Sequence, residues 1–240
     1  MLKRQKLGQH YLVDPDVIRK MVSTAAVRRD EVVLEIGTGK GSLTNALKDV
    51  CKSLEGYEVD PANFEETKEL VGGRNVRLHL ADVFETSPTF DVLVSSLPYS
   101  RSSDFVEWLS QKKYDRAVVL LQEDFVEKIT SSPGERSYRS ISAIAQISSD
   151  IRLGDRVWKN AFRPQPRVSS RIVTFLPRIR LRRPQIDLIK RLFSLRRRTL
   201  SSALDKAGVG PAASGLDLAK RVYHLSPTEV YQMVSEVSRA

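Results

Sequence analysis

The chain has 240 residues, of which 41% are hydrophobic, and this is enough to bury a substantial core and excludes a wholly disordered protein. Cys51 is its only cysteine, which excludes an intramolecular disulfide and argues against a cysteine-based metal cluster. The net charge is +10, but residues 152–198 alone carry 15 basic and 2 acidic residues, and this arginine-rich segment favours a polyanionic partner, above all nucleic acid, over a merely solvated surface.

Strand-like and helix-like segments alternate over the first 125 residues. Asp14 with Pro15, and Asp60 with Pro61, each form a pair of N-cap and first helical residue that predicts a helix. Short apolar runs predict strands at 32–37, 53–59, 75–80, 91–94 and 117–121, with further helices around 43–50 and 104–110. Strands joined by helices require crossover connections, so we expect an α/β fold with a doubly wound, largely parallel sheet.

The pattern changes after a polar loop at 131–140. Two apolar runs, at 141–148 and 170–176, are interpreted as later strands at an antiparallel edge of the sheet. From Pro184 onward the periodicity is helical, with segments at 186–195, 197–208 and 226–237. We therefore predict one domain of residues 1–180 and a small helical domain of residues 181–240.

Targeting signals and metal-ligand patterns are not evident in the sequence. The N-terminal segment carries basic residues without the apolar stretch of a secretory signal, and no apolar run reaches the length of a membrane span. The three histidines, His10, His79 and His224, are far apart and show no ligand spacing. We expect a soluble, cytoplasmic protein without a metal site.

The segment EIGTGKG at 35–41 places glycines where a predicted strand turns into a helix. A glycine turn lets a ligand approach the backbone, although a tight turn alone would also explain the pattern. A dinucleotide-binding loop would require G-x-G-x-x-G, whereas here Gly37 and Gly39 are followed by Ser42 at the third position. The acidic residue Glu35 precedes the loop, so a ligand without an obligatory pyrophosphate fits better.

Two more acidic residues follow predicted strands. Glu58 lies 19 residues after Gly39 and can accept hydrogen bonds from ribose hydroxyls, and Asp82 can accept one from an adenine amino group. Each of these carboxylates could instead cap a helix. Strand ends converge on one edge of an open α/β sheet, so together with Glu35 they indicate an adenosine-containing cofactor, for which S-adenosyl-L-methionine is the best fit.

The segment SLPY at 96–99 follows another predicted strand. Pro98 ends the strand because it has no N–H to donate, and a strand end with an aromatic plug is one interpretation. The other is a site for a planar exocyclic amine, in which the Ser96 hydroxyl and the Leu97 carbonyl accept its two N–H bonds. Tyr99 would stack on the unpaired base, and catalysis would consist of positioning and electrostatic complementarity.

These motifs together resemble the ribosomal RNA small-subunit adenine-N6 dimethyltransferase family, nearly from end to end. The segments that carry the resemblance are GQHYL (8–12), EIGTGKG (35–41), EVD (58–60), ADV (81–83), SLPY (96–99), FRPQPRVSS (162–170) and FSLRRRTLSSAL (193–204). The resemblance implies a Rossmann-like class I methyltransferase with a mostly parallel seven-stranded sheet and a small C-terminal helical domain. It also implies that S-adenosyl-L-methionine is the cofactor.

The resemblance also implies roles for residues that the spacing alone does not assign. Gln9, His10 and Leu12 would line the cofactor site together with Val59 and Val83, and Phe162 would cover the second face of the target base. The implied reaction transfers two methyl groups to each of two adjacent adenosines near the 3′ end of small-subunit rRNA, in an immature subunit, by a monomer. The basic residues expected to bind rRNA phosphates are Arg178, Arg180, Arg182, Arg183, Arg196, Arg197 and Arg198.

One position departs from the family pattern. Ser96 stands where the family has asparagine, and a hydroxyl is shorter than an amide and both donates and accepts hydrogen bonds. Two alternatives stay open. Ser96 motivates the first, a ribosome-assembly factor with weak or no methyltransferase activity. The second is a methyltransferase of large-subunit rRNA, from which the GQHYL element and the helical tail do not distinguish this chain.

Overall fold

The computed structural model describes residues 10–209 and 215–237. The chain divides into two compact units. The first contains Met1–Phe105, Lys113–Glu123 and Arg152–Pro177, and the second contains Val106–Lys112, Asp124–Ile151 and Arg178–Ala240. The last change of unit, between Pro177 and Arg178, lies near the boundary expected after residue 180, and the division into domains of residues 1–180 and 181–240 stays a prediction.

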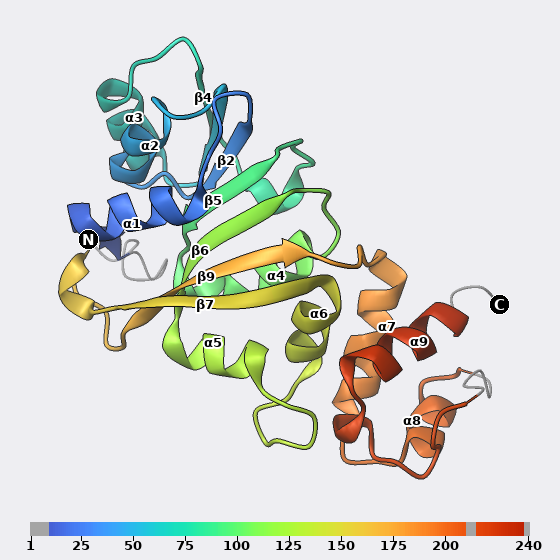
Figure 1. Ribbon diagram of the computed structural model, residues 1–240. Coiled ribbons are helices and arrows are strands. Elements are labelled where there is room, and N and C mark those ends of the chain that lie inside the picture. Colours follow the sequence, from blue (N-terminus) through green and yellow to red (C-terminus); the bar gives the residue numbers. More distant parts are fainter. Residues whose placement is uncertain (1–9, 210–214, 238–240) are drawn as a thin grey trace. The chain divides into compact units, whose positions relative to one another are not determined.

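Seven strands form one sheet in the order β4-β3-β2-β5-β6-β9-β7 (Figure 1). Their bounds are Val32–Ile36 (β2), Ser53–Glu58 (β3), Val76–Leu80 (β4), Val92–Ser96 (β5), Arg116–Gln122 (β6), Ser149–Val157 (β7) and Ser170–Pro177 (β9). The pairs among β2 to β6 are parallel, whereas β9 runs antiparallel to β6. This mostly parallel seven-stranded sheet confirms the predicted α/β class.

A separate two-stranded sheet joins distant parts of the sequence. Strand β1 (Tyr11–Leu12) pairs antiparallel with β8 (Phe162–Arg163), so that Leu12 lies opposite Phe162. The backbone N–H of Val13 continues the contact by donating to the carbonyl of Ala161 at 2.9 Å. The predicted N-terminal motif and the predicted target-base motif are therefore neighbours in the first unit.

Two helices of the first unit begin at the predicted Asp-Pro pairs. Helix α1 (Pro15–Ala25) has Asp14 as its N-cap, and α3 (Pro61–Leu70) has Asp60, each carboxylate accepting from two backbone N–H groups. Helix α1 packs its buried residues Ile18, Met21 and Ala25 against β5, β6 and α2 (Ser42–Leu47). These contacts continue into an apolar core that includes residues of β2 and β5.

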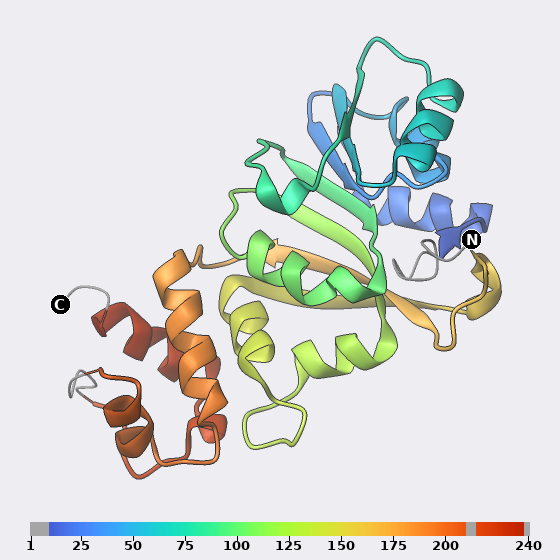
Figure 2. The same ribbon diagram turned by 180° about the vertical axis from the view of Figure 1, so that it is seen from behind.

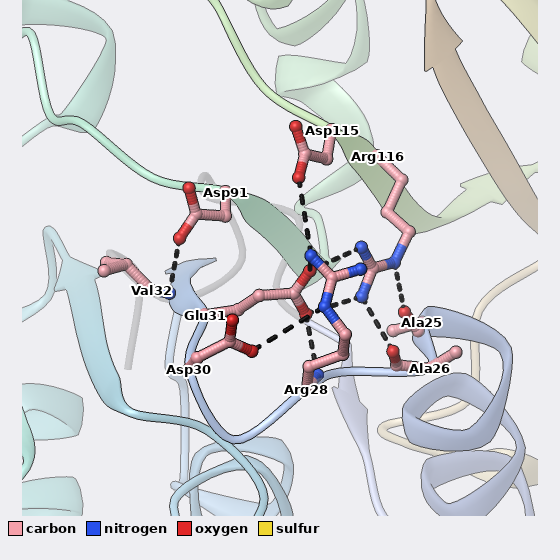
Figure 3. A network of polar contacts seen from close by, with 9 residues as sticks. All are labelled: Ala25, Ala26, Arg28, Asp30, Glu31, Val32, Asp91, Asp115 and Arg116. Atoms are coloured by element: carbon pink, nitrogen blue, oxygen red, sulfur yellow. Dashed lines mark hydrogen bonds and ion pairs between the residues drawn. The ribbon is translucent and has the colours of Figure 1, made fainter.

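An ion-pair network closes the amino end of strand β2 (Figure 3). Glu31, only 2% exposed, accepts two hydrogen bonds from the Arg116 guanidinium at 2.9 and 2.7 Å, and Arg28 adds a third cationic contact at 2.8 Å. Arg116 also donates to the carbonyls of Ala25 and Ala26 at the end of α1. Hydrogen bonding to Arg116 lowers the pKa of Glu31 below its ordinary value. The network thus fastens the helix to the sheet.

The second unit consists mainly of helices. Helices α6 (Ser140–Ser148), α7 (Arg183–Ser194) and α9 (Pro227–Val237) pack on one another, and α7 and α9 lie side by side in both views (Figures 1 and 2). The buried hydroxyl of Tyr138 ties the loop before α6 to the carbonyl of Leu225 at 3.1 Å. Helix α8 (Leu200–Lys206) and all but the first residue of α5 (Glu123–Thr130) also belong to this unit, whereas α4 (Ser102–Leu109) is divided between the two units.

One predicted element is wrong. Residues 141–148 were expected to form a strand, but they form α6 and the strand β7 follows them. An apolar run that is buried on nearly every side carries no amphipathic signal, so its composition does not separate a strand from a helix. The isoleucines at 141, 144 and 147 are spaced by three, which is a helical spacing, and Ser142 caps the first turn by accepting from the Arg139 N–H at 3.0 Å.

Candidate functional site

Several strands of the first unit end around one cavity of about 340 Å³. This volume is in the range of small-molecule sites. Its lining includes most of the residues predicted for the cofactor: His10, Leu12, Glu35, Gly37, Gly39, Glu58, Val59, Asp82, Val83 and Ser96. Gln9, which was also predicted there, lies outside the described residues. The cavity opens at the carboxyl ends of the parallel strands, the edge where open α/β sheets bind ligands.

The glycine loop shapes one wall of the cavity. Gly37 and Gly39 have φ angles of +75° and +55°, a region that residues with a Cβ rarely adopt. A Cβ on Gly39 would also lie 3.2 Å from the Tyr11 ring. The loop therefore requires glycine at this position to bring its backbone beside Tyr11.

Glu58 is held by three backbone donors. Its Oε2 accepts from the Gly39 N–H at 2.8 Å, and its Oε1 accepts from Val59 and Asp60 at 2.8 and 2.9 Å. A carboxylate has about four acceptor positions, so about one remains free for a ligand. Glu58 can bind one ribose hydroxyl in this arrangement, and the second predicted bond requires sharing or displacing a backbone donor.

Glu35 is a buried carboxyl without a cationic partner among the described residues. It is 1% exposed, and its Oε2 has no hydrogen-bond partner in the described part of the chain. Desolvation, with a smaller contribution from the nearby Glu58 carboxylate, raises its pKa from 4.5 to about 8. Thr38 Oγ1 and Asn63 Nδ2, both buried at the same cavity, also have no partner there. The Glu35 carboxyl and the Thr38 hydroxyl can accept hydrogen bonds from a polar ligand, and Asn63 Nδ2 can donate one to it.

Asp82 is already engaged by a residue that the sequence analysis missed. Its Oδ1 accepts from the Phe84 N–H at 2.9 Å, and its Oδ2 accepts from the Arg101 guanidinium at 2.9 Å. Arg101 also pairs with Asp104 at 2.8 Å and lies over the Phe84 ring at 4.7 Å. Two of the about four acceptor positions of Asp82 are thus occupied, and an adenine amino group can use one of the others beside the arginine. No local sequence signal links Arg101 to an aspartate 19 residues earlier.

The SLPY corner borders the same cavity. Ser96 is the last residue of β5, and Ser96, Leu97 and Pro98 all line the cavity wall. The next residue, Tyr99, begins a 3-10 turn and is not among the lining residues. The corner therefore places the predicted amine acceptors at the cofactor cavity and the predicted stacking ring beside it.

Tyr99 is fixed by a hydrogen bond to a residue of the FRPQPRVSS segment. Its hydroxyl lies 2.8 Å from Ser170 Oγ, and burial raises the pKa of the phenol, so the ring stays neutral. The His10 ring is tilted against it with centroids 5.4 Å apart. His10 Nδ1 also lies 2.8 Å from the carbonyl of Pro164. Ser170 ends the FRPQPRVSS segment, and nothing in the sequence indicates its contact with Tyr99.

Phe162 is packed in the core in this structure. It is 1% exposed and belongs to the apolar cluster that contains Leu12 and Ile18. Its ring centroid lies 6.4 Å from that of Tyr99 at an interplanar angle of 68°. A base stacked between two rings needs them nearly parallel, so a sandwich requires one ring to turn. The role of Phe162 at a target base stays a prediction.

The arginines predicted to bind RNA belong to the second unit. All are exposed except Arg196, which is half-buried: its guanidinium donates to the Tyr138 carbonyl at 2.9 Å and lies over the Tyr223 ring at 5.6 Å. Desolvation, and then the charges of Arg139 and Arg197, lower the pKa of Arg196. Crowded guanidinium groups of this kind attract anions.

In the part of the chain that the structure describes, no helix is long and apolar enough to cross a membrane. Within the same residues, no group of three or more His, Cys, Asp or Glu side chains is arranged to hold a metal ion.

Solved structures share the fold. A dimethyladenosine transferase from Plasmodium falciparum matches with a TM-score of 0.80 and 22% identity, over 96% of this chain and 98% of that one. The 23S rRNA methyltransferase ErmE matches with a TM-score of 0.66 and 24% identity, over 95% and 99%. At these identities the likeness establishes the fold, which is that of the class I methyltransferases and confirms the predicted architecture.

Sequence relatives identify the family. A probable ribosomal RNA small subunit methyltransferase A from Pyrococcus abyssi is 33% identical over 240 residues, which cover 95% of this chain and 89% of the relative. A probable dimethyladenosine transferase from Caenorhabditis elegans is 33% identical over 71% of this chain and 58% of its own length. The family model described as ribosomal RNA adenine dimethylase matches residues 1–239. The chain therefore belongs to the ribosomal RNA adenine dimethylase family.

Proposed function

We propose that this protein uses S-adenosyl-L-methionine to dimethylate N6 of two adjacent adenosines near the 3′ end of small-subunit rRNA. The observation that carries the proposal is that the SLPY corner and the acidic strand ends line one cavity. A cofactor held by the strand ends would thus lie beside the groups that face the target amine. We further propose that the substrate is an immature small ribosomal subunit, that the protein acts as a monomer, and that the reaction takes place in the cytoplasm.

The residues present fit this cofactor. Glu58 offers a free acceptor position for a ribose hydroxyl, and the unpaired Glu35 carboxyl fits the positively charged part of the molecule. Asp82 would accept from the adenine amino group at an acceptor position that Phe84 and Arg101 leave free. When bound, the cofactor supplies a methyl group attached to a positively charged sulfur.

The chain's own groups would make the amine reactive. The nitrogen lone pair of adenine N6 is delocalised into the ring, so the amine is a weak nucleophile. The Leu97 carbonyl and the Ser96 hydroxyl would accept its N–H bonds and favour a pyramidal nitrogen, while Tyr99 holds the ring by stacking. The bound cofactor would supply the methyl group to this nitrogen, and the surplus proton of the amine would leave to water. A second transfer to the same nitrogen completes dimethylation.

The test is to incubate the full chain with immature small subunits and isotopically labelled S-adenosyl-L-methionine, and to map modified adenosines by mass spectrometry. We expect N6-dimethyladenosine at two adjacent positions near the 3′ end of the small-subunit RNA. Intact cofactor and subunit binding without methylation would contradict the proposal and support an assembly factor. Methylation of large-subunit RNA instead would support the other alternative.

Ser96 is the observation that favours a weaker enzyme. Its side chain ends one bond short of an amide, and no hydrogen bond to its hydroxyl holds it among the described residues. The same assay with Ser96→Asn decides whether this limits the reaction. We expect equal or faster dimethylation, and complete loss would show that the amine does not bind at this position.

A further inference from the structure

Trp158 is an unusually exposed aromatic residue in the first unit. Its exposed fraction is 62%, whereas the only other tryptophan in the chain, Trp108, is 6% exposed. Tryptophan is highly buried on average and is enriched at interfaces, so a ring exposed to this extent is available for a contact. Such rings serve as surfaces for stacking or for protein contacts.

The ring is held in place and not simply unpacked. The Arg156 guanidinium lies 4.7 Å from the Trp158 ring centroid, and Arg156 Nε donates to Ser169 Oγ at 3.0 Å. The Trp158 carbonyl accepts from the Ala161 N–H at 3.1 Å, which closes a turn. A cation anchored against one face orients the ring and leaves its other face for a ligand, at a low entropic cost.

The surroundings are cationic. Between residues 152 and 171 the sequence has six basic residues and one acidic residue, Asp155, which pairs with Lys20 at 3.0 Å. Lys159, Arg163 and Arg167 are exposed, and none of them forms an ion pair within the described residues. Uncompensated positive charge around an exposed aromatic ring matches single-stranded nucleic acid, which offers phosphates and π-faces together.

The position of the ring relates it to the proposed catalytic site. Phe162 follows Trp158 by four positions, so their Cα atoms lie within about 14 Å of each other. Phe162 in turn lies 6.4 Å from Tyr99, measured between ring centroids. An extended RNA strand that places one base near Tyr99 can place a neighbouring base on Trp158.

We propose that Trp158 is a stacking platform for an unpaired nucleobase that flanks the target adenosine. Lys159, Arg163 and Arg167 bind the phosphates of the same RNA segment. The location of this base relative to the target rests on the proposed function, whereas the stacking itself does not. Neither the arginines of the second unit nor the SLPY corner performs this role.

The probe is a short single-stranded oligoadenylate, titrated against the full-length protein while tryptophan fluorescence is recorded. A Trp108→Phe background leaves Trp158 as the only tryptophan, so its emission reports directly on stacking. We expect quenching that saturates with the oligoadenylate and reverses at high salt. In the wild-type background, Trp158→Ala weakens binding about ten-fold, and Trp158→Phe, which keeps an aromatic face, recovers most of the affinity.

The matched control is Leu153→Ala, because Leu153 is exposed to a similar extent, 51%, in the same strand region but is not aromatic. It leaves oligoadenylate binding unchanged. Methyl transfer to immature subunits provides a second readout: Trp158→Ala raises KM for the subunit and leaves kcat nearly unchanged. Loss of kcat alone would contradict a role in binding.

Unchanged oligoadenylate affinity in Trp158→Ala, or absence of quenching, would overturn the proposal. So would a shift in sedimentation from dimer to monomer with RNA binding intact, because the ring would then be a protein interface. If Trp158 is quenched and the variant binds weakly while no adenosine is methylated, the stacking platform stands and the proposed enzymatic function fails. The two ideas can therefore be separated.

Discussion

Strand β2 has a buried glutamate near each end, and the two carboxyls are in opposite electrostatic situations. Glu31, just before the strand, is 2% exposed and bonded to two guanidinium groups (Figure 3). Glu35, within the strand, is 1% exposed and has an oxygen without a partner in the described residues. Hydrogen bonding to Arg116 lowers the pKa of Glu31, whereas desolvation raises that of Glu35 to about 8.

Burial alone therefore does not reveal what a carboxyl does. The charge of Glu31 is compensated inside the protein, so it stabilises the fold. The charge of Glu35 is uncompensated and costs stability whenever it is present, which is typical of a group reserved for a ligand. Partner identity, more than exposure, separates the structural end of this sheet from its functional end.

The largest effect is expected on stability at the amino end of β2. Glu31→Gln removes the charge that Arg116 pairs with, and breaking one partner of a buried ion pair costs about 3 to 5 kcal/mol in the free energy of unfolding. Urea denaturation at pH 7 measures the loss. Glu35→Gln is the matched comparison: at pH 7 the unfolded chain has ionised Glu35 and the folded protein must protonate it, so this variant should gain stability and not lose it. Equal losses of the free energy of unfolding in both variants would contradict the different roles of the two carboxyls.

The pH dependence of stability should have opposite signs at the two residues. The folded protein holds a proton on Glu35 that the unfolded chain releases between pH 4.5 and about 8, so this group's contribution falls as pH rises through that window. Glu35→Gln should thus become the more stable protein toward pH 8, by on the order of 3 kcal/mol. For Glu31, whose pKa is lowered, the contribution is present above pH 4.5 and is lost as pH falls. Cofactor-free urea denaturation between pH 4 and pH 9 tests both slopes, and parallel slopes would contradict them.

Of the two glutamates near the ends of β2, only Glu35, at the carboxyl end, should affect cofactor binding when it is substituted. If the ionised Glu35 contacts the positively charged cofactor, Glu35→Gln weakens S-adenosyl-L-methionine binding about 10- to 100-fold, the range of a charge-assisted hydrogen bond. Binding at pH 7 should release close to one proton in the wild type and none through this group in the variant. Calorimetry in buffers of different ionisation enthalpy measures both quantities. Glu31→Gln should leave them unchanged, and proton release that persists in Glu35→Gln would place its source elsewhere.

The smallest effect is expected for Arg28, the second arginine that pairs with Glu31 at the amino end of β2. Arg28 also pairs with Glu31, but its side chain is 62% exposed, against 15% for Arg116. Solvent screens exposed ion pairs, so Arg28→Ala should lower the free energy of unfolding by less than about 1 kcal/mol. Arg116→Ala measured beside it should cost several times more. If both variants lose a similar free energy of unfolding, solvent exposure does not determine the strength of these two ion pairs.

Much of the fold followed from local chemistry in the sequence. The Asp-Pro pairs at 14–15 and 60–61 cap helices because a carboxylate before a proline satisfies free backbone donors, and this operates within four residues. The run at 141–148 was misread because uniform burial removes the polar positions that reveal a period. Strand β7, with the pattern SDIRLGDRV, was missed because its charged, glycine-containing sequence has no continuous apolar run.

The candidate site was predictable where its residues follow strand ends. Glu35, Glu58 and Asp82 could be brought together from topology alone, since parallel strands end at a common edge. Arg101 could not, because the contact of its flexible side chain with Asp82 depends on how the turn after β5 folds back. The near-perpendicular packing of Phe162 on Tyr99 is likewise a property of the core and not of the motif.

The two-residue ladder between β1 and β8 has a thermodynamic consequence. Tyr11 and Leu12 line the cofactor cavity, and their ladder partners are Arg163 and Phe162. A cofactor that shifts one strand of this ladder also shifts the other, which carries the predicted contact to RNA. Coupling free energies between two binding sites are reciprocal. If the bound cofactor raises the affinity for RNA by some factor, bound RNA raises the affinity for the cofactor by the same factor. Two pairs of residues in this ladder would then determine the coupling free energy between the two binding sites.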